Sequence, residues 1–415
     1  MVDLRFAGTV LAAGMAVLLG GCTPTALQKP YPRSSTEVRK AMATALEAND
    51  RPALTRRAIE LAWMGGTLSD ATLTRIAPSL DPRILAAAGT NWSVRDETPV
   101  ESFRQWFAAN GQTYAKSTPF AEVPAEYRLV EGVAWDAEKQ RLFIGTVVEG
   151  RLAYRDPDGS WHEVPVGSPR GGLFGMAVDA PRRLLWIATG SVEQTAVHGE
   201  RMAGLIAVDL DSLQVVRRVP LAAGATGAAG DLAIAADGTV YVSNVLSGAI
   251  HRCLPGCAVL KDLIAPGTFR NPQGLAVSAN GKRLYIADYL SGLWVIDPRK
   301  PAPKQLAIGE PTMLEGIDGL AISGGVLVAI QNGTRPRRIV RFLLERDRIV
   351  MTQRWIAISP EAGEPTLGVV RTAEDDMLFV GDSQWERYGP GGVLKDGQPP
   401  RPTPILLTGL TDLVV

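Results

Sequence analysis

The sequence predicts an all-β protein, a six-bladed β-propeller preceded by a small α-helical segment. From about residue 120 onward, a unit of four short apolar strands recurs six times, and its first strand carries a Gly-apolar-Ala-apolar pattern. The 43 glycines and 29 prolines recur along the chain, as many short strands and turns require. Because a four-stranded antiparallel blade cannot bury both of its faces alone, six blades packed around a central channel form the stable arrangement.

The composition describes a folded chain and narrows the function classes. The 415 residues are 46% hydrophobic and 21% charged, and 43 basic residues balance 43 acidic ones. This balance disfavours disorder, and without a long basic run we expect no nucleic-acid partner. Only three histidines are present, which disfavours any site that needs several imidazoles.

The first residues have the pattern of an export signal. Arg5 precedes an apolar run over residues 6–19, which is short for a membrane span, and Leu19-Gly20-Gly21-Cys22 follows. This resembles a bacterial lipoprotein signal peptide over residues 1–21. The resemblance implies cleavage before Cys22, lipidation of its thiol and a tether over residues 22–34. Thr23 after the cysteine implies anchoring in the outer membrane of the cell envelope, facing the periplasm. An uncleaved membrane anchor is the alternative.

Residues 35–115 have a helical pattern. Ser34 and Glu37 form a candidate capping box for a helix that ends near Glu47. Asp50 can cap a second helix with Pro52 in its first turn. Shorter helices are expected from residues 69 and 81, and a last one from residue 98 carries a stripe that we expect to be core, namely Phe103, Trp106 and Phe107.

The propeller is expected over residues 120–415. Equivalent positions in its six first strands are 43 to 56 residues apart; they are Ala134, Ala177, Ala233, Ala276, Ala321 and Val370. The longest interval contains a polar insertion at 191–203, which we expect to form a loop on one face. Residues 410–415 are a candidate closing strand, and the sequence does not say which blade receives it.

Apart from Cys22, the chain has only Cys253 and Cys257, separated by Leu-Pro-Gly. Pro255-Gly256 predicts a hairpin turn, which would place the two thiols opposite each other on paired strands. In an oxidising compartment a disulfide is the natural interpretation. A zinc site is disfavoured because two thiolates supply only half of the four ligands that zinc requires. A redox-active cysteine pair is the remaining alternative.

Three segments carry a more specific resemblance: EGVAWD from Glu131, the stretch Asn271–Asp297 that contains GLAVSANGKRLYIAD, and IDGLAIS from Ile317. They resemble the regucalcin/gluconolactonase (SMP-30) family of six-bladed propellers, over about residues 120–400. The paraoxonase-like and strictosidine-synthase-like propellers are similar as well. The family resemblance implies a divalent cation, usually calcium, at the mouth of the channel.

Carried over residue by residue, the resemblance implies that Glu131 binds the metal, and that Asp318 both binds it and acts as general acid/base. The asparagine of the family corresponds here to Gln273, which keeps an amide oxygen on a longer arm. A further family asparagine falls near Asp231, which we include in the metal set. Phe174 occupies the position where paraoxonase-like relatives have a histidine, so a histidine-dependent mechanism is disfavoured.

The repeat register leads to the same place. Glu131, Gln273 and Asp318 occupy one position in three blades, so radial symmetry brings three oxygen-bearing side chains to one rim. Such ligands suit calcium or magnesium. Asp231 falls in the glycine position of its repeat, and a one-residue shift reverses the face that a strand side chain addresses. The second strands bring four further residues to this edge, as an outer shell or as turn caps: Asn244, Asp288, Asn332 and Asp382.

Two functions follow from these patterns. The first is a calcium-dependent hydrolase of a lactone or related ester, in which Asp318 moves the proton. The second is a non-catalytic envelope lipoprotein that uses the propeller to bind a ligand or a protein partner. A quinone-dependent dehydrogenase is disfavoured because no cofactor-binding signature is present.

Overall fold

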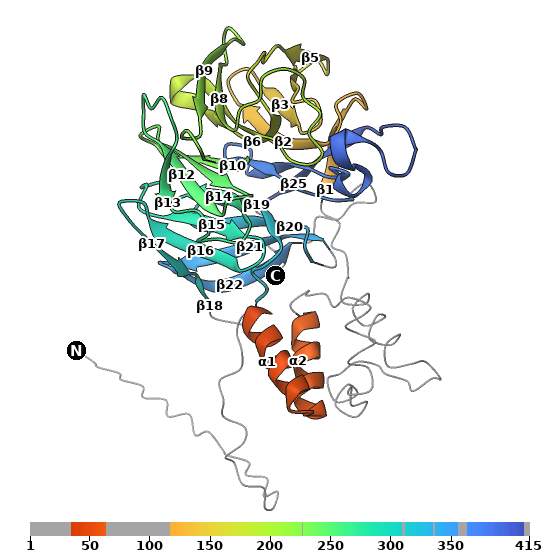
Figure 1. The fold of residues 1–415 in the computed structure, drawn as a ribbon, viewed down its shortest axis with the longest axis vertical. Helices are drawn as coiled ribbons and strands as arrows, with labels where there is room; N and C mark the ends of the chain where they lie inside the picture. The colour runs from red at the N-terminus through yellow and green to blue at the C-terminus, as the bar shows by residue number, and fades with distance from the viewer. Residues whose placement is uncertain are drawn as a thin grey trace, which may run out of the picture.

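The computed structural model describes residues 35–63, 117–225, 227–308, 312–334, 337–355 and 363–410. Within these residues the chain forms six mainly antiparallel sheets arranged in a ring (Figure 1). The predicted six-bladed propeller with a small N-terminal helical segment is therefore confirmed. The predicted signal peptide, Cys22, the tether and the helices expected beyond residue 64, with Phe103, Trp106 and Phe107, lie outside the described residues.

Each blade runs from an inner strand at the channel to an outer strand at the rim. Blade one contains β2 (Val130–Asp136), β3 (Arg141–Thr146), β4 (Leu152–Arg155) and β5 (Trp161–Val164). Blade two contains β6 (Gly172–Asp179), β7 (Leu184–Gly190), β8 (Gly204–Asp209) and β9 (Val215–Pro220). Blade three contains β10 (Ala229–Ile234), β11 (Val240–Asn244), β12 (Ala249–Cys253) and β13 (Lys261–Ile264).

The second half of the ring repeats this order. Blade four contains β14 (Pro272–Val277), β15 (Leu284–Asp288), β16 (Gly292–Asp297) and β17 (Lys300–Gln305). Blade five contains β19 (Ile317–Ser323), β20 (Val326–Gln331), β21 (Arg338–Glu345) and β22 (Arg348–Trp355), with the short β18 (Ala307–Ile308) parallel to β22. Blade six contains β23 (Gly368–Arg371), β24 (Asp376–Val380), β25 (Thr403–Gly409) and β1 (Ser117–Val123).

Blade six closes the ring by joining the two ends of the propeller sequence. Its outer strand β1 precedes blade one in the chain and pairs antiparallel with β25. Residues 411–415, in the candidate closing strand, lie outside the described residues, and Leu410 follows the end of β25. The sequence did not identify β1 as the closing strand, because its pairing partner lies almost 300 residues later.

The hydrophobic core lies between neighbouring blades. Six clusters of buried side chains each join two adjacent sheets of the described chain. Phe143 and Ile187, for example, join blades one and two, and Phe342 and Ala287 join blades five and four. This packing places the inner strands side by side around the channel, which positions the residues at its mouth.

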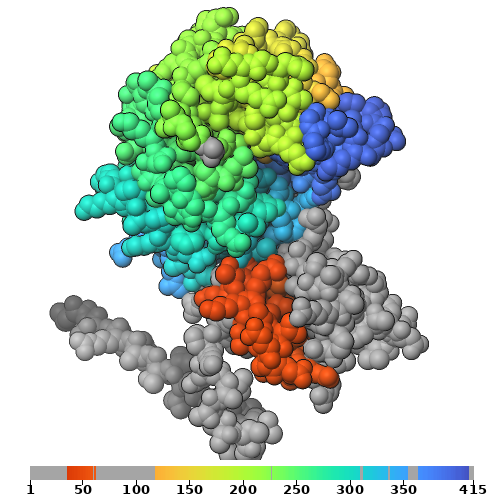
Figure 2. Space-filling view, in the orientation of Figure 1, coloured from red at the N-terminus to blue at the C-terminus, as the bar shows by residue number. Residues whose placement is uncertain are grey.

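Two helices precede the propeller and pack against each other, α1 (Ser35–Glu47) and α2 (Arg51–Trp63). Asp50 caps α2 as expected, accepting a hydrogen bond of 3.0 Å from the amide of Ala53. The hydroxyl of Thr36 in α1 donates to Glu315 in blade five, and Figure 2 shows the helical pair (red) against that side of the propeller. No helix in the described ranges is both long and apolar enough to cross a bilayer.

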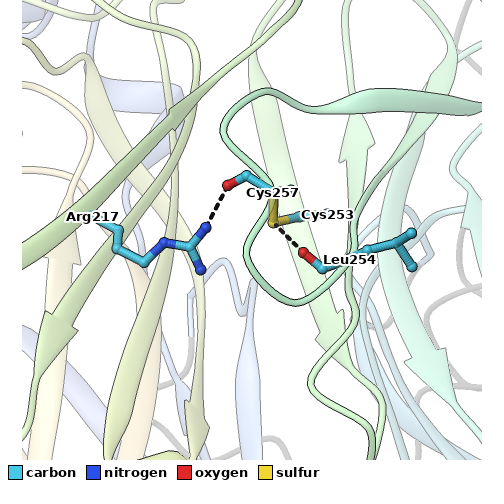
Figure 3. Close-up of a disulfide and its surroundings, with 4 residues drawn as sticks. All are labelled: Arg217, Cys253, Leu254 and Cys257. Atoms are coloured by element: carbon cyan, nitrogen blue, oxygen red, sulfur yellow. Dashed lines mark hydrogen bonds between the residues drawn. A yellow bond between two sulfur atoms is a disulfide. The ribbon is translucent and has the colours of Figure 1, made fainter.

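Cys253 and Cys257 form a disulfide, drawn in Figure 3. Cys253 ends β12, whereas Cys257 lies in the connection to β13 and pairs with no strand, unlike the expected arrangement across a strand pair. Arg217 of blade two donates a hydrogen bond to the carbonyl of Cys257, and its guanidinium lies over the ring of Trp186. The disulfide therefore stiffens a turn that contacts the neighbouring blade.

Ring closure by β1 gives a direct prediction. Removing residues 1–123 deletes β1, so β25 would lose its pairing partner and the core between blades six and one would be exposed to solvent. We expect that this variant no longer unfolds in one cooperative thermal transition. Calorimetric scans of this variant and of a matched variant that lacks only residues 1–116 measure the effect. Equal, cooperative unfolding of both variants would contradict the assigned role of β1.

Candidate functional site

A cavity of about 450 Å³ opens at one end of the central channel. Among its described lining residues five are acidic and none is basic; the acidic ones are Glu131, Glu193, Asp231, Asp318 and Glu364. Phe174, Tyr289 and Trp385 supply aromatic surface. The cavity is thus a negatively charged pocket with partly apolar walls, of a size that suits a small ligand.

Local bulges in the inner strands turn the site residues into the channel. In five blades the register between the first two strands shifts near the start of the inner strand. Gln273-Gly274, for instance, lie between the paired residues Pro272 and Leu275. A bulge re-aims side chains. The glycine is required because an added Cβ at Gly274 would lie 2.6 Å from the carbonyl oxygen of Asp318 in the next blade.

Glu131 lies at the bulge of β2 and is 6% exposed. The indole Nε1 of Trp385 donates a 2.7 Å hydrogen bond to its Oε2. Burial and the neighbouring charge of Asp318 hold the pKa of Glu131 well above its usual value. The tryptophan therefore orients a carboxylate that is almost completely buried.

Asp318 lies at the equivalent position of β19 and is 8% exposed. Asn332, directly after β20, donates a 2.7 Å hydrogen bond from Nδ2 to Oδ2 of Asp318, while its own Oδ1 accepts one of 3.0 Å from the Tyr289 hydroxyl. These contacts leave Oδ1 of Asp318 without a hydrogen-bond donor in the described part of the chain. Burial raises the pKa of Asp318 to about 7, against the lowering effect of the Asn332 amide.

Asp231 occupies a different level of the channel. Its Oδ2 accepts a 3.0 Å hydrogen bond from the amide of Leu275, and Gly175 gives it space, since a Cβ there would lie 2.3 Å from its Oδ1. Asp231 lines both the mouth cavity and a second cavity of about 700 Å³ towards the other end. Burial raises its pKa to about 7. The bulge of β10 presents both Gly230 and Asp231, which explains how a residue in the glycine position still faces inward.

Gln273 lies in the cavity wall and donates a 2.8 Å hydrogen bond to the side chain of Asn271. Its Oε1 accepts no hydrogen bond from the described residues. The structure thus brings Glu131, Gln273 and Asp318 to one cavity and places Asp231 at its inner end. In the described ranges, no three His, Cys, Asp or Glu side chains converge closely enough to hold a metal as they stand.

The four outer residues divide into different roles. Asn332 donates a hydrogen bond to Asp318, one of the predicted metal ligands. Asn244 and Asp288 accept hydrogen bonds from backbone amides in turns, which matches the turn-cap alternative. Asp382 accepts a 3.0 Å hydrogen bond from the amide of Glu364. Asn244 also contacts the buried His251, whose other ring nitrogen is 2.8 Å from Asp262.

Sequence analysis missed Glu364 and Trp385. Trp385 lies in η4 (Trp385–Arg387), within the long connection from β24 to β25, and this length between two short strands is the signal that could have found it. The predicted insertion at 191–203 does lie at the mouth, where Glu193 accepts a 2.8 Å hydrogen bond from the amide of Gly391 in the same connection. Glu364 precedes β23 by several residues, outside the repeat position that the pattern defines.

The donor set fits a hard divalent cation. Carboxylate and amide oxygens surround the cavity, and Oδ1 of Asp318 and Oε1 of Gln273 remain available. The cavity gathers buried carboxylates whose pKa values are raised by burial and by one another. A bound dication would offset both effects, and oxygen ligands of mixed charge suit calcium or magnesium.

No protein-family model matches the chain, and no curated protein matches its sequence. Solved structures with similar backbones include a gluconolactonase from Xanthomonas campestris, at 16% identity and TM-score 0.47, covering 70% of this chain and 98% of that one. They also include the calcium-binding protein regucalcin from Agrobacterium tumefaciens, at 14% identity and TM-score 0.47, covering 70% and 95%. A PQQ-bound aldose sugar dehydrogenase from Streptomyces coelicolor has 18% identity and TM-score 0.47, covering 71% and 99%.

The raised pKa of Asp231 predicts a pH-dependent cost to stability. Between its ordinary value of 3.8 and about 7 the folded protein holds a proton that the unfolded chain releases. The free energy of unfolding is therefore highest below about pH 4, where Asp231 is protonated in both states. It falls as pH rises to about 7, because the folded state must then ionise a buried carboxyl. In chelator, Asp231→Asn should raise the free energy of unfolding at pH 8 by at least about 1 kcal/mol and by much less at pH 4.

Urea denaturation at the two pH values measures this difference. The exposed Glu193→Gln, which removes a charge from the rim of the same cavity, is the control and should show no such gain. An equal effect of Asp231→Asn at both pH values would contradict the assigned electrostatic cost.

Proposed function

We propose that the mouth of the channel binds a divalent cation, calcium by its donor chemistry, and hydrolyses a lactone or related ester. The observation that carries this proposal is the convergence of buried carboxylates and amide oxygens on one small cavity without a basic lining residue among those described. Glu131, Gln273 and Asp318 would hold the cation, and Asp231 would add negative charge from below. Bound there, the cation would polarise the ester carbonyl.

The residues of the chain supply the remaining chemistry. Asp318, oriented by Asn332, accepts a proton from the attacking water and returns it to the leaving alkoxide as the ester bond breaks. Trp385 holds Glu131 in place through its hydrogen bond and lines the same cavity. A cavity of about 450 Å³ suits a substrate the size of a sugar lactone.

The proposal predicts that Asp318→Asn lowers kcat for a responsive lactone by about 100-fold or more, because the neutral amide cannot accept the proton. A panel of aldonolactones with calcium, followed by a pH-indicator assay of acid release, measures this. His198→Ala, in the exposed blade-two loop, is the control and should keep full activity.

Calcium binding measured by calorimetry separates the outcomes. Saturable binding without turnover of any lactone would favour the non-catalytic binding scaffold, whose ligand or envelope partner a pull-down would then identify. No binding of calcium or magnesium to a folded sample would contradict the metal-dependent mechanism.

We also propose that the protein is a lipid-anchored component of the cell envelope, in the outer membrane and facing the periplasm. This rests on the sequence around Cys22. Cys22→Ser should leave the protein unlipidated, which the mass of its N-terminal peptide measures after expression in a Gram-negative host. An unchanged mass and unchanged membrane fraction would contradict lipidation at this residue.

A further inference from the structure

Blade three contains a buried histidine that the proposed mechanism does not use. His162 and His198 are exposed, whereas His251 in β12 is only 2% exposed. Both of its ring nitrogens are engaged, since Nδ1 lies 2.8 Å from Oδ1 of Asp262 in β13 and Nε2 lies 3.1 Å from Nδ2 of Asn244 at the end of β11. The three side chains thus form a line of hydrogen bonds from the outer strand of the blade towards the mouth.

The contacts of Asn244 determine which nitrogen of His251 carries the proton. Oδ1 of Asn244 accepts hydrogen bonds of 3.2 Å and 3.1 Å from the backbone amides of Ala228 and Ser247. Because these amides can only donate, the oxygen of Asn244 faces them and its NH2 group faces the imidazole. Nε2 of His251 is therefore the acceptor, and the proton lies on Nδ1, which donates to Asp262. This is the neutral form of the ring.

Asn244 in turn connects two segments of the cavity wall. Ala228 directly precedes β10, the strand whose Asp231 lines the mouth cavity. Ser247 belongs to the turn after β11, whose Leu246 lines the cavity as well. The neutral imidazole accepts a hydrogen bond from Asn244 and so holds in place the residue that joins these segments. It therefore helps to fix the blade-three side of the mouth.

Few charges act on His251. The carboxylate of Asp262 favours the protonated ring, but this side chain is 51% exposed, and burial outweighs its effect and lowers the pKa of His251. Asp231 in β10 points towards blade four instead. Four basic side chains on neighbouring strands contribute nothing to this shift: Arg252 and Lys261 on the opposite face of blade three, and Arg217 and Arg218 in β9 of blade two.

We propose that His251 is a pH-sensitive switch for the blade-three side of the mouth, which is held when the ring is neutral and released when the ring is protonated. Protonation places a hydrogen on Nε2 that points at the NH2 group of Asn244, so two donors oppose each other and the hydrogen bond is lost. Asn244 is then displaced, and the amides of Ala228 and Ser247 lose their acceptor. This inference is independent of the proposed cation and hydrolysis, because neither uses His251.

The direction of the pH effect follows from the lowered pKa. The unfolded chain takes up a proton at His251 near the usual pKa of 6.5, whereas the folded protein does so only at lower pH. The stability that the neutral ring contributes is therefore complete above pH 6.5 and is lost as pH falls through the pKa of the folded state. This effect is opposite in sign to that of Asp231.

NMR of full-length protein that contains ¹⁵N-labelled histidine tests the state of the ring. At about pH 7.5 the signals of His251 should show a neutral imidazole with its proton on Nδ1. On acidification His251 should protonate at lower pH than the exposed His162 and His198, which are internal references. The variant His251→Gln identifies the signals. A proton on Nε2, or a titration that coincides with those of the two exposed histidines, would overturn the proposal.

Hydrogen exchange measured by mass spectrometry tests the effect on the mouth, through overlapping peptides across residues 227–248. Relative to the intrinsic chemical rate, exchange at the amides of Ala228 and Ser247 should rise by about 10-fold or more between about pH 7.5 and about pH 5, because buried donors lose their acceptor. His251→Gln should remove this rise, since its side-chain oxygen can accept from Asn244 and does not titrate.

Two further variants complete the test. Asp262→Asn removes the carboxylate that favours the charged ring, so it should move the rise in exchange to lower pH. His162→Gln, at an exposed histidine, is the control and should behave as the parent protein. An equal rise in the parent and in His251→Gln, or no rise in the parent, would overturn the switch. If His251→Gln already exchanges fast at neutral pH, Asp262→Asn decides, and an unshifted rise in that variant would overturn the proposal.

Discussion

The close approach of the six inner strands at the channel mouth is the constraint on which the site depends. At Gly132 an added Cβ would lie 2.0 Å from the carbonyl oxygen of Phe174 in the next blade, so the bulge can carry a side chain only at the preceding residue. That residue is Glu131 in blade one, and Asp318 follows the same rule in blade five. Tight packing between blades thus decides which residues face the channel.

This arrangement buries three carboxyl groups close together at the channel. The carboxyls of Glu131, Asp231 and Asp318 are at least nine-tenths buried, and burial raises the pKa of each. Such a cluster opposes folding at neutral pH, and the core between the blades must offset it. The proposed cation would turn the same repulsion into binding free energy, which is why the site and the stability of the protein are linked.

Two loops add residues to the site that the inner strands form. The blade-two insertion and the long connection in blade six meet where Gly391 bonds the carbonyl of Glu193, and this connection brings Trp385 onto Glu131. The same connection, through Asp382 and Ser383, holds Glu364. Blade six therefore carries both the closure of the ring and two side chains of the site, so the integrity of the ring and the geometry of the site are coupled.

The sequence by itself determined the blade repeat, the inner-strand positions of Glu131, Gln273 and Asp318, and the position of the blade-two insertion. These follow from local periodicity, which each blade repeats. Only the tertiary structure decided that β1 closes blade six, that Asp231 accepts a hydrogen bond from Leu275 of the neighbouring blade, and that Trp385 and Glu364 join the mouth. These depend on contacts between residues far apart in the chain and on loops without a repeat, which no local pattern specifies.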